Sequence, residues 1–217
     1  MARLILFDVD GTLVDSQAHI QAAMAVAFAD QGLSAPDRAA VLSIIGLSLP
    51  QAMARLAPGA DADALSDAYK ASFASTRASA GDPAPLYPGA RGALDRLHGA
   101  GFLLGTATGK SRRGLDHMVV HHGLQAHFVT LQCADDHPSK PHPSMVLRAM
   151  QDAGVGPEDT VMIGDTTFDI QMGRAAGVAT IGVNWGYHPV ADLRSCGAGV
   201  IVDDFTALCQ AIEGVTG

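Results

Sequence analysis

Strand-like and helix-like patterns of apolar residues alternate along most of the chain. The apolar run from residue 3 to Phe7 stops at Asp8, as a buried strand of a parallel sheet does. Beyond residue 85 the pattern predicts strands at 102–107, 127–131, 160–164, 178–183 and 200–202. Helices are predicted between them at 90–98, 111–122, 143–153 and 167–176. This alternation predicts a parallel sheet whose strands are joined by right-handed helical crossovers.

The segment between the first strand and residue 85 has helical spacing and no strand pattern. Apolar residues recur every four positions from Ile20 to Phe28, and Gly32 follows them as a predicted helix end. A second helix is predicted after Pro50, and a third over residues 65–73. All of the regular structure predicted in this segment is therefore helical.

A linker marks the return from this helical segment to the sheet. Three prolines lie between residues 82 and 88, a density typical of a connection between structural units. We therefore predict an α/β fold with a doubly wound, Rossmann-like parallel sheet formed by residues 1–14 and 86–217. Residues 15–85 are predicted to form an inserted all-helical domain.

Composition and charge exclude several other classes of protein. Of the 217 residues 48% are hydrophobic and 17% charged, and no apolar run approaches the roughly 20 residues of a membrane span. No targeting signal is evident at the N-terminus, so a cytoplasmic protein that does not contact membranes is expected. The three cysteines suggest neither a disulfide framework nor a metal site. A net charge of −8 disfavours binding to nucleic acid.

Polar residues follow the predicted strands at the positions where such a sheet binds ligands. In doubly wound sheets ligands lie beyond the carboxyl ends of the strands. The first strand ends at Asp8, the next at Thr108 and a later one at Asp165, while Lys140 lies in a loop before a helix. We expect these four residues to converge on one crevice.

The stretch GTATGKS, residues 105–111, resembles a nucleotide-binding P-loop. A P-loop has four residues between its first glycine and the Gly-Lys pair, whereas three separate Gly105 from Gly109. A magnesium-binding aspartate could come from Asp8, but it precedes the loop, which is the reverse of the usual order. The spacing therefore disfavours an NTPase.

The stronger chemical signal is DVDGTLVDS, residues 8–16. Two aspartates separated by one residue end an apolar strand, and a glycine then permits a sharp turn. Beside a divalent cation one carboxylate can stay ionised as a nucleophile, while the other would have to carry a proton. An ordinary aspartate-rich turn is the alternative reading of this motif on its own.

A second acidic motif, GDTTFD at residues 164–169, favours the catalytic reading. Its two aspartates, Asp165 and Asp169, follow an apolar strand and face one side as a helix begins. Four carboxylates around one crevice repel one another unless a cation neutralises them. Oxygen ligands without a Cys/His cluster favour Mg²⁺, and Lys140 can balance part of the remaining charge.

Together these motifs resemble those of the haloacid dehalogenase superfamily. The four, in order, are DVDGT at 8–12, the strand ending in Thr108-Gly109-Lys110, Lys140-Pro141, and GDTTFD at 164–169. The closest likeness is to the phosphoglycolate phosphatase-like hydrolases, which carry a helical cap where this chain has its insert. The resemblance spans residues 3 to about 190. It implies a magnesium-dependent phosphatase that acts on a small phosphorylated metabolite, with 2-phosphoglycolate as the first compound to test.

The resemblance also assigns roles to the first motif and the acidic residues. Asp8 would attack phosphorus and become an aspartyl phosphate, and Asp10 would protonate the leaving alkoxide and then activate water. Mg²⁺ would be held by the side chains of Asp8 and Asp165 and by the backbone carbonyl of Asp10. Asp169 would assist, directly or through the other ligands.

The phosphoryl group would be bound by the second and third motifs. The resemblance implies Thr108, Lys140 and backbone N–H groups near Gly109 as its ligands. Thr106 would take this role if the strand ended two residues earlier. Relatives often have Asn at the position of Gly109, so one side-chain contact is expected to be missing here.

Several alternatives remain open from the sequence. A phosphomutase shares all four motifs, and a receiver-like signalling module also accepts phosphate on an aspartate. His117 and His121 could share a helix face as zinc ligands do, although a solvated surface is the commoner outcome. His137 and His142 flank Lys140 and are interpreted as loop residues. The oligomeric state is expected to be monomer or dimer.

Overall fold

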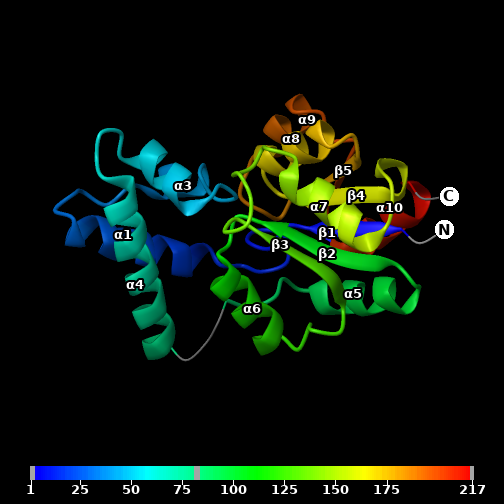
Figure 1. The fold of residues 1–217 in the computed structure, drawn as a ribbon, viewed down its shortest axis with the longest axis horizontal. Helices are drawn as coiled ribbons and strands as arrows, with labels where there is room; N and C mark the ends of the chain where they lie inside the picture. Colours follow the sequence, from blue (N-terminus) through cyan, green and yellow to red (C-terminus); the bar gives the residue numbers. More distant parts are fainter. Residues whose placement is uncertain (1–2, 81–83, 216–217) are drawn as a thin grey trace.

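The computed structural model describes residues 3–80 and 84–215, with side chains described over 3–73 and 84–214. A layered α/β unit forms one half of the molecule, and a group of helices from the first part of the chain lies beside it (Figure 1). Residues 81–83, which include the first part of the predicted 82–88 linker, lie outside the described residues.

Six parallel strands form the central sheet in the order β3-β2-β1-β4-β5-β6. The strands are β1 (Leu4–Phe7), β2 (Leu103–Thr108), β3 (Phe128–Cys133), β4 (Thr160–Gly164), β5 (Ala179–Val183) and β6 (Val200–Val202). The chain builds outward from β1 in one direction and then returns to build outward in the other. This is the doubly wound topology, and the predicted fold class is confirmed.

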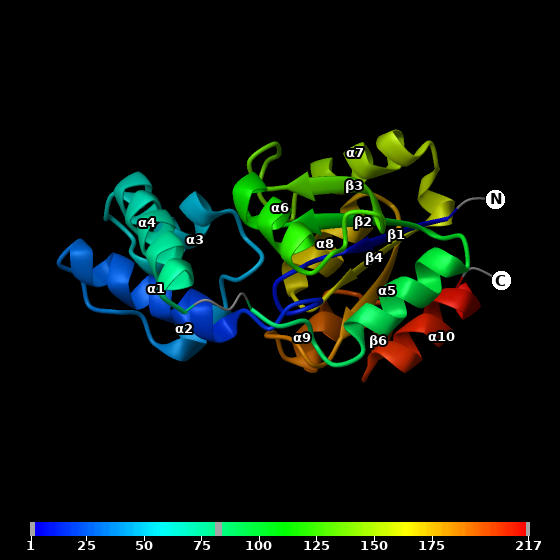
Figure 2. The ribbon, with the colours of Figure 1, turned by 90° about the horizontal axis from the view of Figure 1, so that it is seen from below.

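The helices that follow residue 84 cover the two faces of the sheet, as Figures 1 and 2 show. They are α5 (Ala90–Gly99), α6 (Arg112–His121), α7 (Ser144–Ala153), α8 (Thr167–Ala175), α9 (Val190–Ser195) and α10 (Phe205–Val215), with a short 3-10 turn at Pro157–Asp159. Because side chains alternate along a strand, Ile5 and Phe7 pack with α5, α6 and α10. Leu4 and Leu6 pack on the opposite face with α7 and α8. The first strand is thus buried on both faces.

Four helices lie between β1 and residue 81, and we call them the helical insert. They are α1 (Gln17–Asp30), α2 (Arg38–Leu42), α3 (Leu49–Leu56) and α4 (Ala62–Ala80). The insert has an apolar cluster of its own, which includes Ile20, Met24 and Phe28, the residues of the predicted four-residue spacing. Phe168, in the first turn of α8, belongs to this cluster, so the insert packs against the start of α8. The division of the chain into two domains remains a prediction.

The sequence predicted most elements to within two residues, with three omissions. The strand expected at 127–131 runs to Cys133, and the helices α2, α9 and α10 were not predicted. The five residues of α2 are too few to show helical spacing, although Asp37 caps the helix by accepting a hydrogen bond from the Ala40 N–H. Among the described residues, no helix is both long and apolar enough to cross a membrane.

Candidate active site

Three buried carboxylates meet at the carboxyl ends of β1 and β4. Asp8 follows β1, Asp165 follows β4, and Asp169 lies in the first turn of α8. One oxygen of each lies within 4.8 Å of one oxygen of the others, and none of the three side chains is more than 1% exposed. One aspartate of the first acidic motif and both aspartates of the second therefore lie together in the fold.

Local hydrogen bonds fix the orientation of Asp169. Thr166 caps α8 by accepting a hydrogen bond from the Asp169 N–H, and Asp169 Oδ2 accepts bonds from the Thr166 N–H and hydroxyl at 3.0 and 2.7 Å. This reciprocal capping box satisfies donors that the start of a helix would otherwise leave unpaired. It leaves Asp169 Oδ1 to pair with Lys140.

Long-range contacts hold Asp165. Its Oδ1 accepts a hydrogen bond from the Thr12 hydroxyl at 2.9 Å, and its Oδ2 accepts one from the Tyr187 N–H at 2.9 Å. Gly11 makes room for it, because a Cβ at this position would lie 2.2 Å from Asp165 Oδ2. Gly11 also has a φ of +86°, which other residues rarely adopt. The glycine of the first motif therefore serves both the turn and the neighbouring carboxylate.

Lys140 lies among these acidic groups and is fully buried. Its Nζ is 2.9 Å from Asp8 Oδ1 and 2.6 Å from Asp169 Oδ1. Asp8 Oδ2 is buried and has no hydrogen-bond partner among the described residues. One ammonium group thus balances part of the charge of three carboxylates, and an acceptor oxygen is left unpaired.

The electrostatics of this cluster shift the ionisation of its members. Burial, followed by the charges of Asp169 and Asp10, raises the pKa of Asp8 to about 7, although Lys140 opposes the shift. Burial and the charges of Asp169 and Asp8 raise the pKa of Asp165 well above its usual range. Burial lowers the pKa of Lys140, but the two carboxylates in contact with it outweigh that effect and raise it. The ammonium therefore stays charged, while the carboxylates need a further positive charge in order to ionise together.

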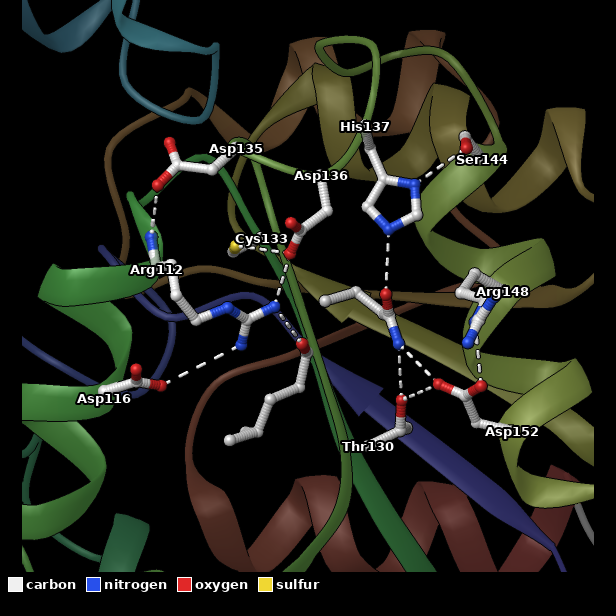
Figure 3. A network of polar contacts seen from close by, with 12 residues as sticks. Arg112, Asp116, Thr130, Cys133, Asp135, Asp136, His137, Ser144, Arg148 and Asp152 are labelled. Carbon is white, nitrogen blue, oxygen red and sulfur yellow. Dashed lines mark hydrogen bonds and ion pairs between the residues drawn. The ribbon is translucent and has the colours of Figure 1, made fainter.

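A polar network at the end of β3 anchors the loop that carries Lys140 (Figure 3). His137 contacts Ser144 Oγ through Nδ1 and Gln132 Oε1 through Nε2, both at 2.8 Å. Gln132 in turn donates to Thr130 and Asp152. His142 lies on the same loop and accepts a hydrogen bond from the Ser144 N–H. The two flanking histidines thus shape the loop, and neither contacts the three carboxylates.

Asp10 lies apart from this cluster and has different partners. Its Oδ1 is 2.7 Å from Lys110 Nζ and also accepts a hydrogen bond from the Ser16 hydroxyl. The Tyr187 hydroxyl accepts a hydrogen bond from the Ser16 N–H at 3.1 Å. The two carboxylates of the DVD motif therefore occupy different environments, since the strand ends at Phe7 and the chain bends at Val9 between them. The contact between Lys110 and Asp10 was not predicted, since the sequence assigned Lys110 no role in the site.

The GTATGKS stretch is a strand followed by a turn. Gly105 lies inside β2 opposite Leu6, so the stretch does not curl around a phosphate as a P-loop does. The strand ends at Thr108, and the alternative in which it ended at Thr106 is wrong. Thr108 Oγ1 accepts a hydrogen bond from the Lys110 N–H at 3.3 Å.

Gly109 lies where the helical insert approaches the sheet. A Cβ on Gly109 would lie 2.6 Å from the carbonyl oxygen of Gly46 and 2.7 Å from that of Leu47. The Ser48 N–H, close by, donates a hydrogen bond to Ser139 Oγ at 2.8 Å. The absence of a side chain at position 109 therefore permits a close backbone contact between the insert and the sheet.

A cavity of about 610 Å³ lies between the helical insert and the ends of the strands. Asp8, Asp10, Thr108 and Gly109 line it from the sheet, and apolar residues of the insert line the opposite side. Of the predicted site residues, Lys140, Asp165 and Asp169 are not among its lining and lie buried behind Asp8. The volume is within the usual range for small-molecule sites, about 300–1,000 Å³.

The three carboxylates fit a divalent cation. They offer only oxygen ligands, which Mg²⁺ and Ca²⁺ prefer, and one oxygen of Asp8 lacks a partner among the described residues. Within the described part of the chain, no other group of three acidic, His or Cys ligands lies as close together. His117 and His121 do share a helix face, with rings stacked 6.2 Å apart, but they belong to no such group.

Comparisons with known proteins agree with this geometry. The chain matches the haloacid dehalogenase-like hydrolase family over residues 5–183. A relative from Dickeya dadantii, named probable phosphatase IndB, is 37% identical over 99% of this chain and 95% of the relative. The phosphoglycolate phosphatase of Pseudomonas putida is 30% identical over 96% of this chain and 79% of that protein. A solved structure from Clostridium acetobutylicum, described as a predicted phosphatase, has a TM-score of 0.89 at 24% identity and covers 99% of both chains.

The chain therefore belongs to the haloacid dehalogenase-like hydrolase family, and the resemblance of its four motifs is confirmed. It is an enzyme of the phosphatase type, the type that the names of its curated relatives give. The similarity extends across the helical insert as well as the sheet, since both curated relatives are aligned over nearly the whole chain.

Proposed function

We propose that this protein is a magnesium-dependent phosphomonoesterase that transfers the phosphoryl group of a small phosphorylated metabolite to Asp8. The observation that carries the proposal is the position of Asp8. Its carboxylate borders the cavity on one side and the acidic pair Asp165 and Asp169 on the other. A nucleophile at Asp8 would thus lie between a substrate-sized space and a set of carboxylates that could hold a cation.

Asp8, Asp165 and Asp169, with the backbone carbonyl of Asp10, would hold the Mg²⁺. The ion would supply positive charge that keeps the carboxylates ionised and stabilises the transferring phosphoryl oxygens. The raised pKa of Asp8 supports the need for this positive charge, because a carboxylate with a pKa of about 7 is only partly ionised at neutral pH. Lys140 would contribute its permanent charge from behind Asp8.

Asp10 would act as general acid and then as general base. Asp10 lines the same cavity as Asp8, so its carboxyl would face the oxygen that leaves when Asp8 attacks phosphorus. Lys110 and Ser16 both contact Asp10 Oδ1, which fixes the carboxyl and leaves Oδ2 for the proton transfer.

Thr108 and the backbone near Gly109 would bind the phosphoryl group from the end of β2. Both residues line the cavity at the end of β2, the strand next to β1. Fixed donors at this place would stabilise charge on phosphoryl oxygens without reorganisation. The expected action in the cytoplasm and the expected monomeric or dimeric state remain predictions from the sequence.

Phosphate release tests the proposal. The wild type and Asp8→Asn would be compared on p-nitrophenyl phosphate and a panel of phosphorylated metabolites that includes 2-phosphoglycolate, with and without Mg²⁺. We expect release that requires Mg²⁺ and is lost in the variant. Absence of release from every compound by the folded, magnesium-loaded wild type would contradict a phosphatase, and activity that required a bisphosphate activator would indicate a phosphomutase.

A further inference from the structure

The side of the cavity that faces Asp8 and Asp10 is built from apolar and aromatic side chains of the helical insert. They are Ile20, Met24, Ile45, Leu47, Tyr69 and Phe73. The cavity volume of about 610 Å³ corresponds to roughly 20 water molecules at ~30 Å³ each. A two-carbon acid phosphate would leave most of this space to water in contact with apolar surface. The cavity therefore suits a larger leaving group.

Tyr69 and Phe73 form a flat surface within this wall. They lie four residues apart on α4 and so share one helix face, with ring centroids 5.7 Å apart and ring planes tilted by 30°. Both rings are half-buried and line the cavity. Two neighbouring rings in this arrangement can pack against a further flat group.

This surface lies beside the proposed general acid. Lys110 Nζ is 2.7 Å from Asp10 Oδ1 and 6.0 Å from the centroid of the Phe73 ring, so a single ammonium group bridges them. Burial and the charge of Asp10 raise the pKa of the Tyr69 phenol, which places that ring within electrostatic reach of the same carboxylate. Since Asp10 would protonate the leaving oxygen, the carbon atoms attached to that oxygen would enter the space next to the two rings.

The cations that line the cavity are poorly placed to bind a substrate carboxylate. Lys110 is paired with Asp10, and Lys70 pairs with Asp67 at 3.0 Å on the exposed side of α4. Arg113 is exposed, so water would screen its charge. An acidic two-carbon leaving group would therefore gain little binding free energy from the part of the cavity wall that it could reach.

We propose that the insert selects phosphomonoesters whose leaving group carries a flat, largely apolar ring, which packs against Tyr69 and Phe73. This inference rests on the proposed phosphatase function and narrows its substrate class. Phe73 then acts as a specificity-determining residue, because it contributes to binding of the leaving group and to none of the chemical steps.

Three unactivated esters test this selection: ethyl phosphate, 2-phosphoglycolate and benzyl phosphate. Their leaving groups are all primary alkoxides, so differences among them report mainly on binding of the carbon skeleton. We expect kcat/KM for benzyl phosphate to exceed that for the other two esters at least about tenfold. A preference for 2-phosphoglycolate, or equal values for ethyl and benzyl phosphate, would overturn the inference.

Two matched variants at Phe73 test whether this side chain causes the preference for benzyl phosphate. Phe73→Leu keeps an apolar side chain but removes the flat ring, whereas Phe73→Tyr keeps the ring. We expect Phe73→Leu to lose most of the preference for benzyl over ethyl phosphate, chiefly through a lower kcat/KM for benzyl phosphate, and Phe73→Tyr to retain the preference. A preference that is unaffected in Phe73→Leu would contradict the assigned role. Failure of the proposed function has a different signature, namely no release from any of the three esters or release that persists in Asp8→Asn.

Discussion

Lys140 Nζ lies 2.9 Å from Asp8 Oδ1, and solvent reaches at most 1% of either side chain. Lys140 also contacts Asp169, so one buried ammonium group touches two of the three clustered carboxylates. A buried charge whose partner is removed is left without compensation from water. The contact therefore bears on stability as well as on the proposed chemistry.

The Lys140→Met variant is expected to be strongly destabilised. Loss of the ammonium leaves Asp8 and Asp169 buried with less compensating charge, and breaking a buried pair costs about 3–5 kcal/mol. Urea unfolding in the presence of a chelator would measure the change. The matched control is Lys70→Met, which removes the exposed pair with Asp67 and should change the free energy of unfolding by less than about 1 kcal/mol. Equal stability of the two variants would contradict the assigned importance of Lys140.

Asp8 should make the stability of the protein depend on pH. Its pKa rises from an ordinary value of 3.8 to about 7 in the fold, so the folded protein holds this proton more tightly than the unfolded chain. The resulting stabilisation is present below about pH 4 and is lost as the pH rises toward 7. In a chelator, the free energy of unfolding of the wild type minus that of Asp8→Asn should therefore decrease between these pH values and then level off. A difference that rises with pH would show that the pKa is shifted the other way.

Magnesium should stabilise the protein through the three carboxylates. A ligand that binds only the folded state adds about 2.7 kcal/mol when its free concentration is 100 times Kd. We expect Mg²⁺ to raise the Tm of the wild type and to have little effect on Asp165→Asn. Asp67→Asn, which changes an exposed carboxylate on the helical insert, is the control and should respond as the wild type does. If Mg²⁺ raised the Tm of Asp165→Asn as much as that of the wild type, the ion would bind at a different site.

Gly109→Ala should disturb the contact between the insert and the sheet. The new Cβ would lie 2.6 Å from the Gly46 carbonyl oxygen, which is backbone and cannot rotate away. We expect a loss of about 1–3 kcal/mol in unfolding free energy, typical of overpacking, together with a lower kcat/KM. Gly92→Ala in α5 is the control, because nothing lies within 4 Å of its added Cβ. Unchanged stability and activity of Gly109→Ala would show that the insert adjusts freely at this place.

Apolar periodicity was sufficient to predict the sheet, because β1 and its neighbours are short buried runs that end at polar residues. The helix α2 escaped prediction because five residues hold little more than one turn. The helix α10 was not assigned even though Phe205, Leu208 and Ile212 have helical spacing, and this signal could have been used.

The clustered carboxylates were predictable because both acidic motifs follow strands whose carboxyl ends meet at one edge of the sheet. Their partners were harder to predict. The Tyr187 N–H reaches Asp165 across 22 residues, and the Tyr187 hydroxyl reaches Ser16 across 171. Gly109 was interpreted as a missing side-chain contact, whereas the structure shows a close approach of the Gly46 backbone. Such contacts depend on how the insert packs against the sheet, which local sequence does not specify.

Chemical trapping of the phosphorylated residue tests the central claim most directly. In Asp10→Asn, p-nitrophenyl phosphate can still transfer its phosphoryl group because nitrophenolate leaves without a proton, but water is no longer activated to release the phosphate. Rapid quenching with acid and reduction with borohydride would convert an aspartyl phosphate to homoserine, which mass spectrometry locates in the chain. The account predicts homoserine in place of Asp8, formed only with Mg²⁺ and substrate. Release of nitrophenolate without any homoserine, or with homoserine at a position other than 8, would contradict the account.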